Sequence, residues 1–154
     1  MKTSTSHMNE TLKIGKNLSK FSTYSCQPKT KDELKSIIDD RIAEEGNICD
    51  LNDIDTSLIT DMSWLFCKTK FNGDISKWNV SNVTNMAYMF KESRFKQSIE
   101  DWDVSNVENM ELMFKEAAFS GDISNWKINE RCATYDTFFN CPIKEEHKPK
   151  SLQK

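Results

Sequence analysis

The chain has 154 residues and a formal net charge of −3 at pH 7; 37% of its residues are hydrophobic and 29% are charged. This balance suits a single domain with a modest core, and the lack of any run of about 18 apolar residues excludes an obvious membrane-spanning helix. Residues 49–143 hold 15 acidic against 9 basic residues, which is the wrong sign for a nucleic-acid surface, where affinity comes largely from neutralised phosphates.

Residues 1–27 are predicted to form a flexible N-terminal arm. The segment is rich in Ser, Thr, Lys and Asn, holds four lysines against Glu10, and has too few apolar residues to bury a core of its own. It also lacks the apolar stretch of a secretory signal. Phe21 and Tyr24 offer the arm something to bury against the body.

Residues 28–48 are predicted to hold a capping helix. Thr30 followed by Glu33 matches a capping box, in which the side chains of the first and fourth residues satisfy unpaired backbone N–H groups. Apolar residues then recur at spacings of three and four, and Gly46 stands where helices often end. These apolar residues are Leu34, Ile37, Ile38 and Ile42. The helix, over about 31–45, is interpreted as the cap of a repeat array, because such arrays expose their core at each end.

A motif with a period of 24 residues fills most of the remaining chain. The sequence reads WNVSNVTNMAYMF from Trp78 and WDVSNVENMELMF from Trp102, and it begins again as WKIN at Trp126. A fixed period of this length is typical of stacked repeat proteins. Aligning the apolar positions predicts a repeat region over 49–143, in four units: 49–72, 73–96, 97–120 and 121–143.

Each unit shows two periodicities, which predict a short strand followed by a short helix. Apolar and polar residues alternate around Trp78 and Val80, as in a strand with one buried face, whereas Val83, Met86 and Met89 follow helical spacing. The predicted fold is therefore an α/β solenoid of the leucine-rich-repeat type, right-handed, with parallel strands and an N-terminal amphipathic capping helix.

The fourth unit departs from the pattern, since it has Arg131, Thr134 and Thr137 where the others have Val, Met and Met. Polar residues suit a last unit whose far side meets water. Residues 144–154 are expected to form a charged C-terminal tail.

The outward residues of the predicted strands are the candidate binding site. Stacked strands would set these residues in rows on one face, which repeat proteins commonly use for binding. One row reads Asp53, Lys77, Asp101 and Asn125, and the next reads Asp55, Asn79, Asp103 and Lys127. The alternative is that a soluble protein needs polar residues there. The Ser and Asn residues at 81–82 and 105–106 are interpreted as turn residues.

No catalytic set, cofactor site or metal site is expected. The two histidines, His7 and His147, stand in opposite tails, and no catalytic motif of the serine, cysteine or zinc type occurs. A carboxylate pair at Asp101 and Asp103, or a calcium site that adds Asp55, is the weaker alternative.

The five cysteines are odd in number and form no CxxC pair, so neither a disulfide framework nor a zinc ribbon is predicted. Free thiols favour a reducing compartment. In an exported protein, Cys132 and Cys141 would be the candidates for a disulfide.

The strings ISKWNVSNVTNMAYMFKES and IEDWDVSNVENMELMFKEA resemble the BspA-like leucine-rich-repeat surface proteins, also described as a mycoplasma-type domain of unknown function. The stretch TKDELKSIIDDRIAEEGNICDLNDIDTSLITDMSWLF resembles their N-terminal cap and first repeat, so that the resemblance spans residues 29–143. It implies a leucine-rich-repeat-like solenoid and protein contacts or adhesion at a bacterial surface.

The predicted function is a non-enzymatic module that binds a protein partner, with the chain itself a monomer. The alternative is an intracellular interaction or inhibitor protein. The resemblance favours the cell surface, and the missing signal favours the cytoplasm.

Overall fold

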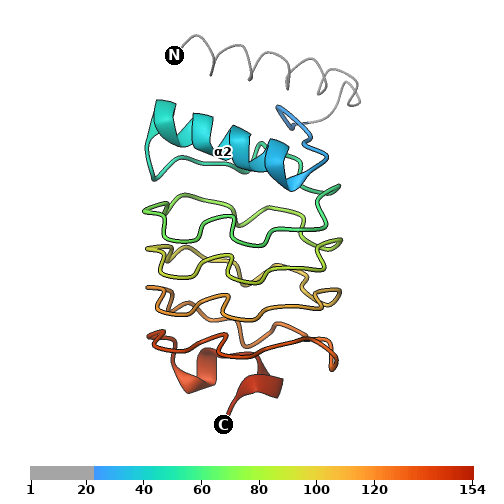
Figure 1. Ribbon diagram of the computed structural model, residues 1–154, viewed down its shortest axis with the longest axis vertical. Coiled ribbons are helices and arrows are strands. Elements are labelled where there is room, and N and C mark those ends of the chain that lie inside the picture. Colours follow the sequence, from blue (N-terminus) through green and yellow to red (C-terminus); the bar gives the residue numbers. More distant parts are fainter. Residues whose placement is uncertain (1–22) are drawn as a thin grey trace.

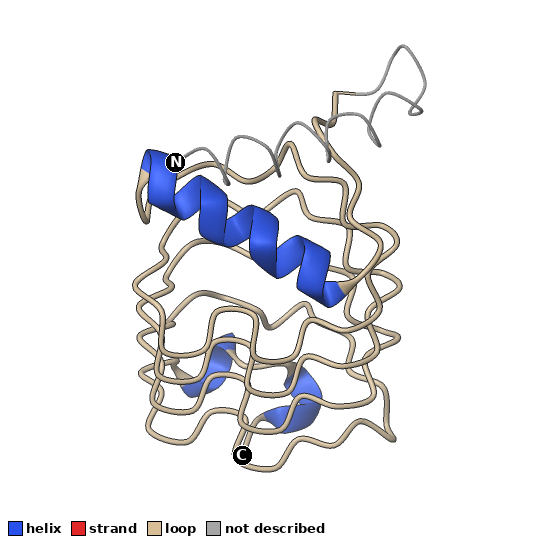
Figure 2. Ribbon diagram, turned by 45° about the horizontal axis from the view of Figure 1, so that its top comes forward, coloured by secondary structure: helices blue, strands red, loops and turns tan. Residues whose placement is uncertain are grey.

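The computed structural model describes residues 23–154, which form a stack of coiled layers closed at one end by a helix (Figure 1). Helix α2 spans Lys31–Glu45, and two short 3-10 helices follow the stack, η1 at Glu145–His147 and η2 at Lys150–Leu152. No strand occurs in this part of the chain (Figure 2). We number the layers 1 to 4 from the α2 end; they hold Phe66, Phe90, Phe114 and Phe138 respectively.

Helix α2 confirms the capping pattern. The Thr30 hydroxyl accepts a hydrogen bond from the Glu33 backbone N–H at 3.2 Å, and the Glu33 carboxylate accepts one from the backbone N–H of Lys29 at 2.7 Å. At the other end the N–H of Gly46, at φ 89°, donates to the Ile42 carbonyl. Leu34, Ile37 and Ile38 are buried, so α2 covers the apolar end of the stack with one face.

The predicted α/β solenoid of strand-plus-helix units is wrong, because the described layers contain neither element. Neighbouring layers run parallel, but their strand-type pairing is limited to isolated β-bridges, for example between Asp61 and Asn85 and between Asn85 and Asn109. Where strands were predicted, the indole N–H of each Trp donates to a carbonyl of the preceding layer: Trp78 to Leu51 at 2.9 Å and Trp102 to Ile75 at 3.1 Å. A carbonyl that would accept a backbone N–H from the neighbouring strand of a ladder thus accepts a side-chain N–H from the neighbouring layer.

The predicted short helices are replaced by what we call the Met–Phe segments, residues 61–69, 85–93, 109–117 and 133–141. In the first segment, N–H groups at alternate residues donate to the next layer, so they are not available for helical bonding. The N–H groups of Leu65, Cys67 and Thr69 close single turns, as from Leu65 to Met62, and that of Ser63 donates to the Asp61 carboxylate. The three- and four-residue spacing of the apolar side chains therefore reflects successive turns and not a helix.

Each complete Met–Phe segment contains two non-glycine residues in the left-handed region, which interrupts any helix there. In layer 2 these are Tyr88 at φ 61° and Glu92 at φ 55°. The same two positions have positive φ in every layer. The other residues are Trp64, Lys68, Leu112, Glu116, Asp136 and Asn140. Left-handed backbone costs a non-glycine residue roughly 1–2 kcal/mol, so the bonds between layers must outweigh that strain.

The core consists of side chains that stack on their counterparts one layer away. The rings of Phe66, Phe90 and Phe114 lie 5.5 and 5.4 Å apart between centroids, nearly parallel, and a second column runs through Phe71, Phe95 and Phe119. All six are fully buried, and each contributes about 1.5–3 kcal/mol by leaving water. The predicted apolar register is confirmed at these positions.

Both ends of the stack are extended by neighbouring segments. The predicted arm 1–27 lies outside the described residues up to residue 22. From Ser25 the chain pairs with layer 1. The Ser25 N–H donates to the Asp53 carbonyl. Cys26 is buried and forms a parallel β-bridge with Ile54. At the other end the residues after Ile143 pack back on layer 4, with the Ile123 N–H bonded to the carbonyl of His147.

Candidate functional site

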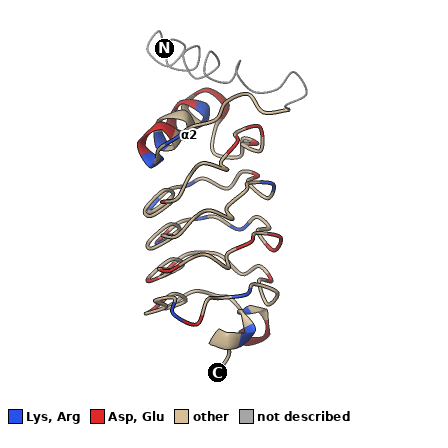
Figure 3. Ribbon diagram, turned by 90° about the vertical axis from the view of Figure 1, so that its right-hand side faces the viewer, with Lys and Arg blue, Asp and Glu red and all other residues tan. Residues whose placement is uncertain are grey.

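The eight candidate residues alternate with buried core positions, and six of them are exposed. In the side view, charged residues lie along the outer edges of the layers (Figure 3). The exposed six are Lys77, Asn79, Asp101, Asp103, Asn125 and Lys127. The structure gives the eight residues three different local roles.

Asp53 and Asp55 are held by the segments that cover layer 1. The Asp53 carboxylate accepts two hydrogen bonds from the Arg41 guanidinium of α2, both at 3.0 Å, and one from the Ser25 hydroxyl at 2.6 Å. Asp55 is buried and accepts a hydrogen bond from the Gln27 amide at 2.8 Å. These two carboxylates therefore fasten α2 and residues 25–27 to the stack, and they do not form part of an open surface.

Asn79 and Asp103 cap turns. Their side-chain oxygens accept from the backbone N–H and the hydroxyl of the serine two residues later, Ser81 and Ser105. The two bonds from Ser105 lower the pKa of Asp103 below its usual range, because both stabilise the carboxylate. Asn106 bonds to the Ser81 carbonyl at 2.7 Å, so the predicted turn role of the Ser-Asn pairs is confirmed.

The remaining four residues have no hydrogen bond or ion pair from their side chains within residues 23–154. These are Lys77, Asp101, Asn125 and Lys127. In layer 4, Asn125 and Lys127 border a hollow of about 390 Å³ that Lys150 of η2 also lines. This part of the candidate surface is both exposed and unused by the fold.

A partly exposed aromatic pair lies in the Met–Phe segments of layers 1 and 2, and the sequence reasoning missed it. The rings of Trp64 and Tyr88 stack with their centroids 3.9 Å apart and a 6° angle between planes. Trp64 is 50% exposed, and the Lys91 ammonium lies 5.8 Å from the Tyr88 centroid. The available signal was that Trp64 stands outside the register of the other tryptophans but 24 residues before an aromatic residue.

The described residues contain no group of three or more His, Cys, Asp or Glu side chains arranged to hold a metal ion. All five cysteines are free, Cys132 and Cys141 among them. Burial raises the pKa of the Cys26 and Cys141 thiols, which disfavours the thiolate needed for nucleophilic chemistry. Within residues 23–154 no helix has the length and apolar content needed to cross a membrane.

Residues 33–150 match the family described as "Mycoplasma protein of unknown function, DUF285". The match covers α2 from Glu33 onward, all four layers and η1. The chain belongs to this family. The family description assigns no activity, and no curated protein and no solved structure matches the chain.

Proposed function

We propose that the chain is a non-enzymatic protein-binding module whose contact surface includes Lys77, Asp101, Asn125 and Lys127. The observation that carries the proposal is that these side chains are exposed and unpaired, and that the tryptophans beside them, Trp78, Trp102 and Trp126, are bonded to the preceding layer through their indole N–H groups. A rigid surface loses little conformational entropy when a partner binds. The mixture of two lysines, an aspartate and an asparagine suits a partner surface that carries both charges.

The Trp64–Tyr88 pair supports the same function from a second surface. Trp and Tyr are enriched among the residues that dominate protein interfaces, and this pair is already stacked before a partner arrives. The resemblance to BspA-like surface proteins also supports binding, and it favours an adhesive role at a bacterial surface.

A paired capture experiment tests the proposal. The parent protein and the variant Lys77→Ala, Asp101→Ala, Lys127→Ala are immobilised and exposed to native cell lysate and surface extract. The matched control is Lys70→Ala, Lys96→Ala, Glu108→Ala, which removes the same number of charges of each sign at other exposed positions. Each variant is first shown to melt like the parent.

A partner held by the parent and the control but lost by the first variant supports the proposed surface. A partner held equally by all three argues against it, and the variant Trp64→Ser, Tyr88→Ser then tests the aromatic pair. Absence of any partner in either extract counts against the binding function.

An intracellular interaction or inhibitor protein is the second candidate, and the five free cysteines favour it, because reducing compartments keep thiols unpaired. Protease treatment of intact cells separates the two candidates. Loss of the protein supports the surface role, and survival supports the intracellular one.

A further inference from the structure

The C-terminal end of the stack presents a row of unpaired backbone N–H groups. In layers 1 to 3 the equivalent groups donate to carbonyls of the next layer, 23 residues later in the chain, at 2.8–3.0 Å. In layer 3 the donors are Met110, Leu112, Phe114 and Glu116. The equivalent residues of layer 4 are Thr134, Asp136, Phe138 and Asn140, and none of their N–H groups has a partner within residues 23–154.

The backbone of layer 4 keeps the geometry of the inner layers. Asp136 and Asn140 have φ values of 50° and 52°, close to the 58° and 56° of Leu112 and Glu116. The carbonyls of Tyr135 and the other alternate residues accept the bonds from layer 3. The free N–H groups of layer 4 therefore point away from layer 3, toward the position that a further layer would occupy.

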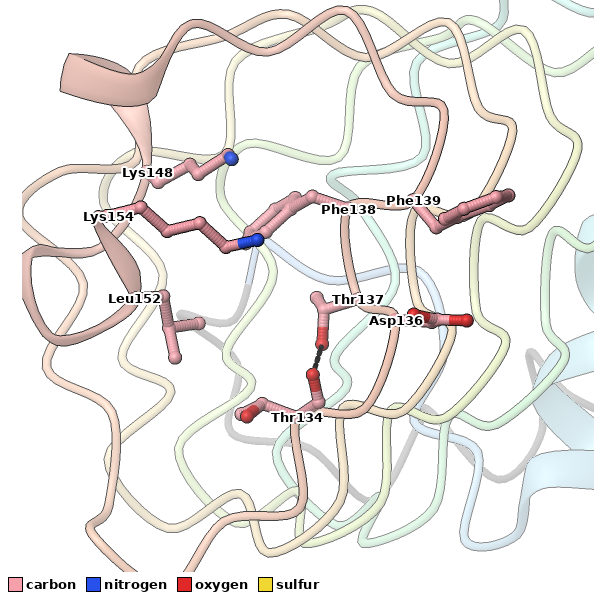
Figure 4. A pocket seen from close by; sticks show the side chains of 8 residues that line it. All are labelled: Thr134, Asp136, Thr137, Phe138, Phe139, Lys148, Leu152 and Lys154. Atoms are coloured by element: carbon pink, nitrogen blue, oxygen red, sulfur yellow. Dashed lines mark hydrogen bonds between the residues drawn. The ribbon is translucent and has the colours of Figure 1, made fainter.

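A pocket of about 360 Å³ lies against this row (Figure 4). Thr134, Thr137 and Phe138 line it from layer 4, and Lys148, Leu152 and Lys154 line it from the C-terminal tail. The Lys148 ammonium lies 5.7 Å from the Phe138 centroid and 2.7 Å from Glu145. Asp136 and Phe139 also line the pocket, on the side of Phe138 away from the two lysines. The wall formed by the C-terminal tail is therefore partly apolar and carries two lysines, of which Lys148 is paired with Glu145.

We propose that this end of the stack binds an extended, acidic peptide segment of a partner protein, which takes the position of a fifth layer. Carbonyl groups of the peptide accept hydrogen bonds from the N–H row, a carboxylate side chain meets Lys148 and Lys154, and an apolar side chain packs on Phe138 and Leu152.

The linear arrangement of the donors favours a peptide over a small anion. Donors at alternate residues match the carbonyls of a second backbone, as in recognition by strand addition, whereas a phosphate or carboxylate takes donors that converge on one point. The same contact already occurs three times within the molecule, between successive layers. None of the residues that line this pocket belongs to the proposed contact surface, so the proposal stands independently of the proposed function.

A synthetic peptide of residues 105–116 is the probe. In the chain, its alternate carbonyls receive the N–H row of layer 2, and it carries three glutamates against one lysine. Amide hydrogen exchange is followed by NMR on the full chain. Without peptide, the amides of Thr134, Asp136, Phe138 and Asn140 should exchange much faster than their layer 3 counterparts. Excess peptide should slow the four by about tenfold or more.

Variants then separate the charge contribution from the backbone contribution. Lys148→Gln with Lys154→Gln should weaken peptide binding about tenfold, whereas the matched control Lys70→Gln with Lys96→Gln should leave it unchanged. Lys154→Gln alone gives a smaller loss in the same direction and leaves the contacts of Lys148 intact. The variant Lys77→Ala, Asp101→Ala, Lys127→Ala should bind the peptide like the parent, so this site and the proposed contact surface can fail separately.

Four results would overturn the proposal. The first is slow exchange of the four amides in the free protein. The second is failure of the peptide to protect these amides, or equal peptide binding by the Lys148→Gln, Lys154→Gln variant and its Lys70→Gln, Lys96→Gln control. The third is equal protection by inorganic phosphate alone, which would make the pocket an anion site. The fourth is protection that rises with protein concentration without peptide, which would make the occupant a second copy of the chain.

Discussion

Replacing Trp102 tests how the layers are held together. Its side chain is 4% exposed, its ring lies parallel to that of Trp126 at 6.4 Å, and its indole N–H donates to the Ile75 carbonyl. Trp102→Ala removes the buried ring, its contact with Trp126 and the hydrogen bond to Ile75. The lost packing should lower the free energy of unfolding by about 3–5 kcal/mol, a large part of the 5–15 kcal/mol that is typical of a whole domain.

Trp102→Phe separates the hydrogen bond from the ring. Phenylalanine keeps most of the buried ring but removes one of the two donors to the Ile75 carbonyl, which keeps its bond from the Trp78 N–H. The loss of one hydrogen bond should cost about 0.5–1.5 kcal/mol. Urea titrations followed by the fluorescence of the remaining tryptophans measure both losses. The exposed control Lys70→Ala should stay within about 0.5 kcal/mol of the parent.

Two results would refute this reasoning. If Trp102→Phe is as stable as the parent, the bond between layers contributes nothing. If Trp102→Ala has the parent's midpoint, the assigned core register is wrong. A reduced dependence on urea concentration in the Ala variant would instead indicate that the layers unfold separately.

Three further predictions concern charge, backbone and thiols. The lowered pKa of Asp103 means that its carboxylate stabilises the fold at pH values above its unfolded pKa of about 3.9 and loses that contribution as the pH falls through its folded pKa. Asp103→Asn should therefore lose stability less steeply than the parent below about pH 4. Parallel curves of stability against pH, measured by urea titration, would contradict this. Glu116 has φ 56°. Glu116→Gly should leave the free energy of unfolding unchanged or raise it by up to about 1 kcal/mol, whereas Glu116→Val should lower it by about 1 kcal/mol. Thermal unfolding measures which variant is more stable, and a more stable Val variant would argue against a left-handed backbone. A chromogenic disulfide reagent should titrate five thiols in denatured protein but react slowly with the native protein at pH 7, because burial raises the pKa of the cysteines; fewer than five thiols would indicate a disulfide.

The sequence predicts the helix and the core register well, because both depend on local rules. Thr30 and Glu33 form a capping pattern that needs no tertiary context, and the apolar positions repeat every 24 residues whatever backbone joins them. The residues at Phe66 and Phe90 had to be buried in any stacked arrangement.

The backbone path within each layer was not predictable in the same way. The left-handed residues Trp64, Tyr88 and Leu112 are types that rarely adopt positive φ, so no glycine or asparagine marks them. Apolar residues at spacings of three and four then look helical. The bonds that impose the actual path join residues 23 positions apart, and a reading of local periodicity does not detect them.

The candidate site was predicted in part for the same reason. Alternation with Trp and Val places Lys77 and Asp101 outside, which local pattern alone determines. Asp53 stands at the equivalent position in the sequence, yet its carboxylate is paired with Arg41 of α2. That contact depends on how α2 crosses the stack, so it follows from tertiary structure.

The one-sided bonding of the Met–Phe segments also gives the stack an electrical polarity. In an ordinary sheet successive peptide dipoles alternate and nearly cancel, but here the alternate peptide groups of each segment all direct their N–H toward layer 4. Their dipoles add along the stack, as they do in an α-helix, and are opposed in part by N–H groups beside the segments, such as those of Thr84 and Arg94, which donate to the preceding layer. The row of N–H groups at the C-terminal end therefore carries partial positive charge, and the carbonyls at the α2 end of the segments carry partial negative charge, although the net charge of the chain is −3. As in a helix, these end charges depend on the number of bonded columns and not on the number of layers.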